Sequence, residues 1–125
     1  MKIKFIFGNY ECVAELDKEK APLTCEAVLK ELPIKSVVNR WGDEIYFETP
    51  VKINVEENSK DVVEEGDVAF WIPGRAICLF FGKTPISDDK IRPASAVNVF
   101  GKIKSDLKPL KQVAPGTKVT VVLEE

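Results

Sequence analysis

The sequence predicts a mostly β domain, with about nine strands and one or two short helices. Valine and isoleucine total 25 residues, against eight leucines and eight alanines, and branching at Cβ favours pleated, half-buried strands. Apolar and polar residues also alternate along most segments, as they do in strands with one buried face. The chain has 125 residues and neither an internal repeat nor a Gly/Ser-rich linker. We therefore expect a single domain over residues 1–125.

Two hairpins are predicted in the first half of the chain. Residues alternate over Lys2–Phe7 and again over Tyr10–Leu16. Gly8-Asn9 between them forms a two-residue turn with glycine first, a common hairpin connection. The same arrangement recurs further on, with Gly42-Asp43 between the expected strands Ser36–Trp41 and Glu44–Glu48.

The remaining strands are expected at Val51–Val55, Asp67–Ile72, Arg75–Phe81, Ala96–Ile103 and Thr117–Leu123. One helix is predicted to begin at Pro22, because proline suits the first helical position. Its apolar residues then recur at helical spacing until Pro33 ends the run. A second short helix or turn is expected near Asp106–Gln112.

Composition excludes several functions. Eighteen basic and 20 acidic residues leave a net charge of −2, so there is no basic excess to bind nucleic acid. The absence of histidine removes Ser–His and Cys–His catalysis and histidine metal sites. The three cysteines, Cys12, Cys25 and Cys78, are too widely spaced for a disulfide framework, so we expect them buried and reduced.

These features favour a cytoplasmic protein. No apolar run has the length of a membrane span, so we expect no membrane partner. We also expect no cofactor and no metal. The few Asn, Gln and Met residues are a sign of a hot-growing source.

Two loops and one strand bear on function. Residues 56–66 are acidic and are expected to form a solvated connection. The loop over residues 82–95 is longer than most strand connections and carries several charges, which is typical of binding elements. The strand Arg75–Phe81 is apolar on both faces. Its outer face must therefore be covered by protein or form a groove.

Three segments, in the same order along the chain, resemble cyclophilins: Asp17–Val28 (DKEKAPLTCEAV), Gly66–Phe81 (GDVAFWIPGRAICLFF) and Val99–Leu107 (VFGKIKSDL). The stretch FFGKTPISDDKIRPASAVNVFGKI, residues 80–103, is similar to short prokaryotic cyclophilin-like proteins of unassigned role. The resemblance implies a closed β-barrel of about eight strands, capped by helix.

The resemblance carries over to the prolyl-isomerase pocket only in part. Phe81 matches an aromatic residue of that pocket, Arg40 falls near the family's catalytic arginine, and Glu48 falls near the pocket glutamine. Leu79 replaces another pocket glutamine, and nothing matches the pocket histidine or the pocket tryptophan. Trp71 stands where the family has a small alanine, so its indole is expected to fill part of the groove.

Three functions stay open. The first is a binding module with a shallow aromatic cleft for a peptide segment or a small molecule, formed by Trp71 and Phe81 and rimmed by Arg40, Glu48, Asp88, Asp89 and Arg92. The second is a weakened prolyl isomerase, in which Phe81 forms an apolar slot and Arg40 donates to the imide nitrogen. The third, implied by fold analogy alone, is a subunit of an amide-processing assembly.

Two carboxylate pairs, Asp88-Asp89 and Glu44 with Glu48, are further candidate sites. Asp88-Asp89 could attract a hard cation, but no D-x-D-x-D-G loop surrounds them. Glu44 and Glu48 share one face of their strand and could form an acid–base pair. Such a pair requires burial that raises a pKa, and the sequence does not indicate it.

Overall fold

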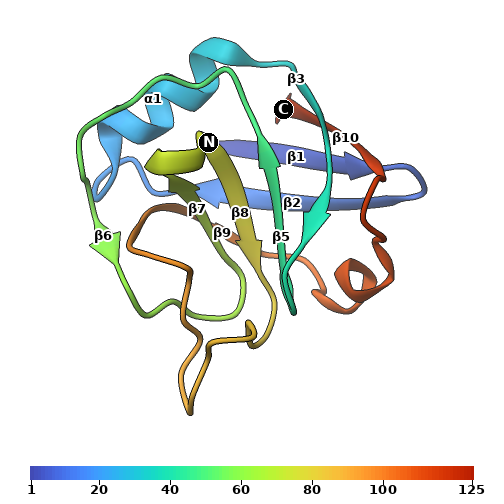
Figure 1. Ribbon diagram of the computed structural model, residues 1–125. Coiled ribbons are helices and arrows are strands. Elements are labelled where there is room, and N and C mark those ends of the chain that lie inside the picture. Colours follow the sequence, from blue (N-terminus) through green and yellow to red (C-terminus); the bar gives the residue numbers. More distant parts are fainter.

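The computed structural model describes residues 1–125, and its ten strands form one antiparallel sheet. The strands are β1 (Lys2–Phe7), β2 (Tyr10–Leu16), β3 (Ile34–Val37), β4 (Asn39–Arg40), β5 (Glu44–Glu48), β6 (Ser59–Lys60), β7 (Asp67–Trp71), β8 (Ala76–Phe80), β9 (Val97–Ile103) and β10 (Lys118–Glu124). Their order across the sheet is β3-β10-β1-β2-β9-β7-β8-β5-β4, and β6 also pairs with β9. The predicted mostly β fold is confirmed (Figure 1).

The expected closed barrel is not confirmed, because no hydrogen-bonded pair of strands joins the two ends of the sheet. The end strands β3 and β4 are nevertheless consecutive in the chain, with Val38 alone between them. The backbone of Val38 bonds to the turn before β10, through Thr117 O at 2.8 Å and Gly116 N at 2.9 Å. The predicted strand Ser36–Trp41 is therefore divided at Val38, where the chain leaves β10 and turns toward β5.

The main core lies on one face of the sheet and contains 25 buried residues. Alternate residues of β1, namely Ile3, Phe5 and Phe7, contribute to it. The helix α1 (Pro22–Glu31) adds Cys25 and Val28 and lies at the end of the molecule opposite the long loop that follows β8 (Figure 1).

The two faces of β8 belong to different clusters, as its alternating pattern predicted. Ile77 and Leu79 enter the main core, whereas Cys78 and Phe80 belong to a second cluster of six buried residues on the other face. That cluster also contains Val63 and Val97 and is partly covered by Ile91. Both faces of β8 are thus buried, which explains why the whole strand is apolar.

Both predicted hairpins are present, and each turn begins with a glycine in the left-handed region. Gly8 has φ +63° and Gly42 has φ +61°. In the first hairpin Phe7 pairs with Tyr10, which leaves Gly8-Asn9 as a two-residue turn. In the second, the backbone groups of Trp41 and Glu44 bond to each other across Gly42-Asp43.

One predicted strand is wrong: residues 51–55 form no strand. Val51 is buried in the main core and Ile53 packs against it. The following residues are fixed by side chains rather than by a ladder, since Asn98 donates to Val55 O at 2.9 Å and accepts from Glu57 N at 3.1 Å. The apolar residues of this segment are thus buried at Val51 and partly buried at Ile53, but Val55 is exposed and the backbone has no strand partner.

The helices agree with the sequence. The predicted helix at Pro22 is confirmed, and a 3₁₀ helix, Lys108–Gln112, occupies the second predicted position. A further 3₁₀ turn, Ile72–Gly74, joins β7 to β8. No helix combines the length and apolar character needed to cross a membrane.

Candidate functional site

Arg40 and Phe81 lie together, but they form no open slot. The Phe81 side chain is 2% exposed and belongs to the main core. The guanidinium carbon of Arg40 lies over its ring, 5.0 Å from the centroid. Arg40 also donates to Val113 O at 2.7 Å and to Gly42 O at 3.0 Å. The expectation that Phe81 forms the floor of a proline slot is wrong in this structure, because Arg40 and the core cover its ring.

Strand alternation explains this placement. Arg40 pairs with Ile45, a core residue on the inner face of β5. The neighbouring residues Trp41 and Glu44 take the opposite face, since successive side chains point to opposite sides of a strand. The outer face of this hairpin therefore presents Trp41, not Arg40.

A cavity of about 150 Å³ lies on this outer face, between β5, β7, β8 and the end of the loop after β8. Six of its eight lining residues are hydrophobic. We call it the aromatic pocket; its lining residues are Trp41, Glu44, Tyr46, Trp71, Cys78, Pro93, Ala94 and Val97.

Glu44 is the charged residue of the aromatic pocket. The residue is 6% exposed, and burial raises the pKa of its carboxyl to about 7, although the neighbouring Cys78 thiol partly opposes the shift. Its strand places it beside Tyr46 on the outer face, two residues along. A carboxyl with a pKa near neutrality can accept, donate or exchange a proton under physiological conditions.

Cys78 faces Glu44 from β8 and is inert. It is 2% exposed, and burial, followed by the charge of Glu44, raises the pKa of its thiol well above the ordinary value. The thiolate is the reactive form of cysteine, so Cys78 contributes shape and polarisability rather than nucleophilic chemistry. The other two cysteines, Cys12 and Cys25, are also buried and free, as predicted.

Trp71 is held in place at the edge of the aromatic pocket. Its indole N–H donates to Ser95 Oγ at 2.7 Å. A Cβ added at Gly74 would lie 2.6 Å from the indole ring, so the ring packs directly on the backbone of the turn between β7 and β8. Because both sides of the ring system are constrained, this wall is preformed.

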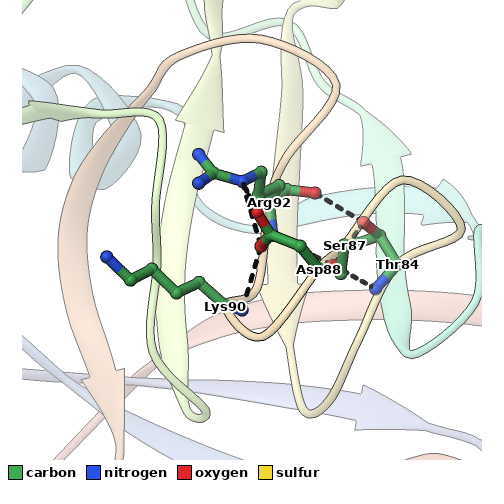
Figure 2. Close-up of polar contacts among 5 residues, drawn as sticks. All are labelled: Thr84, Ser87, Asp88, Lys90 and Arg92. Carbon is green, nitrogen blue, oxygen red and sulfur yellow. Dashed lines mark hydrogen bonds and ion pairs between the residues drawn. The ribbon is translucent and has the colours of Figure 1, made fainter.

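The loop that closes the aromatic pocket is braced internally. Ser87 Oγ accepts from the backbone N–H groups of Thr84, at 2.9 Å, and Arg92, at 3.0 Å. The Asp88 carboxylate accepts from Lys90 N at 3.0 Å and from Arg92 Nε at 3.1 Å. Figure 2 shows these contacts, with the Lys90 ammonium group pointing away from them. These hydrogen bonds hold the part of the loop that precedes Pro93 and Ala94, the two residues that it contributes to the pocket.

The same loop is anchored to the hairpin that presents Trp41. Asp43 N donates to Lys83 O at 3.0 Å, and Phe81 N donates to Asp43 O at 2.9 Å. The approach is close: a Cβ on Gly42 would lie 2.8 Å from Lys83 O, and a Cβ on Gly82 would collide with the Asp43 carboxylate. Glycine at both positions is thus required for the loop to lie against the hairpin.

Of the residues predicted for the aromatic cleft and its rim, Trp71 alone lines the aromatic pocket. Phe81 and Trp71 belong to different clusters on opposite faces of the sheet, so the predicted pairing of these two rings is wrong. The proposed rim is not assembled around the pocket either, since none of its members lines it: Arg40, Glu48, Asp88, Asp89 and Arg92. Glu48 and Asp89 are exposed, and Asp88 and Arg92 bond to each other.

Sequence reasoning missed Trp41, Tyr46 and the burial of Glu44. The signal for a covered outer face is present in the apolar strand β8, and the alternation of β5 predicts only that Glu44 and Glu48 share one face of that strand. The burial of Glu44, however, depends on Pro93, Ala94 and Val97, which are about fifty residues away in sequence. No local pattern reports such a contact.

A larger and more open depression, of about 890 Å³, lies beside β2 and β9. Five lysines and five carboxylates line it, so their charges balance. One of the lysines, Lys102, is already paired with Glu64 at 3.0 Å and Asp67 at 3.2 Å. The aromatic pocket is the better candidate, because its lining is mostly apolar and contains a carboxylate without a cation.

Comparison with known proteins agrees with the fold. The solution structure of a hypothetical protein from Archaeoglobus fulgidus is 63% identical to the chain, with a TM-score of 0.86, over 98% of this chain and 93% of that one. The structure of McbB in complex with tryptophan is 16% identical, with a TM-score of 0.77, over 98% of this chain and 44% of that one. At this sequence identity, the similarity to McbB shows a shared fold only.

A search of curated proteins gave no match. The family model described as cyclophilin-like matches residues 1–122, nearly the whole chain. The matched range includes the three segments on which the resemblance rests. The chain belongs to the cyclophilin-like family.

Proposed function

We propose that the protein is a binding module for a small organic molecule and that the aromatic pocket is its binding site. The observation that carries this proposal is a buried carboxylate, Glu44, in a cavity walled by three aromatic side chains. Small-molecule sites are typically apolar concavities with a few polar groups that fix the orientation of the ligand.

The size of the cavity limits the ligand. A cavity of about 150 Å³ accommodates roughly one benzene-sized ring, and the aromatic pocket has this volume. The expected ligand is therefore a single-ring compound or a ring carried by a larger molecule that extends into solvent. The sequence left open a peptide segment or a small molecule as the ligand. The volume of the aromatic pocket favours the small molecule.

The walls support binding because they are held before a ligand arrives. Trp71 is fixed by Ser95 and Gly74, and the loop that supplies Pro93 is braced through Ser87. A preformed site does not lose affinity to the ordering of its side chains.

Tryptophan fluorescence tests the proposal directly. The chain has two tryptophans, Trp41 and Trp71, and both line the aromatic pocket, so selective excitation reports this site alone. We expect a set of single-ring compounds to include one that changes the emission saturably. Indole compounds belong in the set, since the McbB structure holds tryptophan.

The matched variants are Trp71→Leu and Leu123→Ala. The first removes a wall of the pocket and should abolish or strongly weaken binding, as detected by calorimetry. The second shortens an exposed side chain of β10, away from the pocket, and should leave binding unchanged. Equal binding by both variants would contradict the proposal.

A further inference from the structure

The buried carboxylate of the aromatic pocket has no counter-ion in the protein. Glu44 is 6% exposed, and no lysine or arginine nitrogen lies within 4.0 Å of its oxygens. No N–H or O–H group of the protein donates to them, and the polar side chain that contacts the carboxyl is the neutral Cys78 thiol. Burying an ionised carboxylate without a partner is costly. The site therefore favours whatever supplies positive charge.

Arg40 and Arg92, on two of the surrounding elements, are already committed, and no ion pair joins Lys83 or Lys90 of the loop to Glu44. On the hairpin turn, Asp43 lies 3.7 Å from Arg40, whose side chain is directed to the other face. On the loop, Arg92 is paired with Asp88 at 3.1 Å. The titratable groups that face Glu44 are Cys78 on β8 and Tyr46 on its own strand, and neither is a cation.

The walls are suited to a cation as well. Trp41, Tyr46 and Trp71 line the pocket, and the faces of tryptophan and tyrosine rings attract ammonium groups, most strongly when the cation is desolvated. A metal ion does not fit this lining, because hard cations require several oxygen ligands and Glu44 supplies the only carboxylate. An anion would be repelled by it.

We propose that the aromatic pocket binds a small organic ammonium ion, with Glu44 as its counter-ion and the aromatic side chains around its apolar part. This inference rests on the proposed function, because it names the class of ligand for the same site. The ligand supplies the positive charge that the protein lacks, so ion pairing and aromatic contact act on one molecule.

Two probes of nearly equal shape separate the two proposals. Benzylammonium carries the charge and benzyl alcohol does not, and both contain one ring of the size that the cavity accepts. On the parent protein, tryptophan fluorescence should give benzylammonium an affinity at least about tenfold higher, as expected for a charge-assisted hydrogen bond to a largely buried carboxylate. Equal affinities would overturn the ammonium assignment and leave the small-molecule site standing. Failure of both probes would overturn the proposed function and this inference with it.

Glu44→Gln and Glu48→Gln form the matched pair of variants. Both residues lie on the outer face of β5, but Glu48 is exposed and lies outside the pocket. Glu44→Gln should lose the preference for benzylammonium and retain benzyl alcohol, whereas Glu48→Gln should behave as the parent. Loss of preference in Glu48→Gln, or its retention in Glu44→Gln, would show that surface charge attracts the amine.

The pH dependence provides a third readout. Benzylammonium stays protonated between about pH 6 and about pH 8, while Glu44 ionises in this range, so affinity should rise with pH in the parent. In Glu44→Gln it should stay constant. A constant affinity in the parent would contradict pairing with Glu44.

Discussion

The guanidinium group of Arg40 covers the ring of Phe81, with 5.0 Å between the guanidinium carbon and the ring centroid. These two residues are the pair that the family resemblance assigned to prolyl isomerisation. Here Arg40 is a structural residue, because its N–H groups are bonded to Val113 O and Gly42 O and its flat face shields a core aromatic ring.

Arg40→Ala is therefore expected to reduce stability rather than a prolyl-isomerase activity. It removes hydrogen bonds to two carbonyl groups and uncovers Phe81, and the expected loss in the free energy of unfolding is about 1–3 kcal/mol. Arg40→Lys should recover only part of it, because lysine lacks the planar fork. Urea unfolding measures the loss of stability, and a proline-isomerisation assay on the same proteins measures activity. Isomerase activity in the parent that disappears in a stable Arg40→Ala protein would refute the structural role.

Glu44 should make the protein less stable as pH rises. Its pKa in the folded protein is about 7, above the usual value of about 4.3 in an unfolded chain. Between these two pKa values the folded state binds more protons than the unfolded state, so the free energy of unfolding falls as the pH rises from about 4.3 to about 7. At about 1.4 kcal/mol for each pH unit, the full decline attributable to Glu44 is roughly 4 kcal/mol.

Glu44→Gln should remove this decline and stabilise the protein at about pH 8 relative to the parent. Denaturant unfolding at several pH values measures the difference. Glu48→Gln is the control, since Glu48 is exposed on the same strand. A Glu44→Gln protein that loses stability at high pH would show that the carboxylate has a partner in the fold.

The start of α1 depends on a residue far away in sequence. Ala21, at the N-cap, provides no side-chain cap. Instead Glu57 accepts from Thr24 N at 2.8 Å and Leu23 N at 3.1 Å. Partial desolvation raises the pKa of Glu57, but the bonds from Thr24 and Leu23 outweigh it and lower the pKa below its ordinary value.

Glu57→Gln should accordingly destabilise the protein by about 1 kcal/mol near neutral pH, a typical cost for loss of a helix cap. Folding lowers the pKa of Glu57. Its stabilisation of the fold is therefore complete above the unfolded pKa of about 4.3 and is lost as the pH falls through the pKa of the folded protein. Thermal unfolding of the parent and the variant, at neutral pH and at a pH below the folded pKa of Glu57, tests this dependence. Glu65→Gln, at an exposed position, should have no comparable effect.

Gly74→Ala should displace the indole of Trp71. The backbone of Gly74 has no positive φ that alanine would strain, but the added methyl group would lie 2.6 Å from the ring. We expect altered tryptophan emission and weaker binding of any pocket ligand, with a folded protein. Ser95→Ala, which frees the indole N–H, should have a smaller effect in the same direction. Unchanged emission in both variants would show that Trp71 is not held as described.

Local patterns predicted much of this fold. Alternation located β8 and indicated that both of its faces are apolar; in the structure Ile77 and Leu79 lie on one face and Cys78 and Phe80 on the other. Glycine-first turns located both hairpins, through Gly8 and Gly42. These features were accessible because each depends on residues within one strand or turn.

The site was harder to predict, because it depends on contacts distant in sequence. A one-residue change of register exchanges Arg40 and Trp41 between the two faces of the sheet, and the resemblance did not determine that register. The aromatic pocket around Glu44 is completed by Pro93 of the loop after β8 and by Val97 at the start of β9, both distant from Glu44 in sequence. Phe81 follows a strand with two apolar faces, so composition could not show that its ring lies inward.

The most direct test of the aromatic pocket is a nuclear magnetic resonance titration that observes the indole N–H signals of Trp41 and Trp71 while benzylammonium is added. Both signals should shift together and saturate at the same concentration, and the backbone signals of β10 on the far side of the core should stay in place. Two unmoved indole signals, or shifts confined to the charged depression around Lys102, would contradict a ligand site at Glu44.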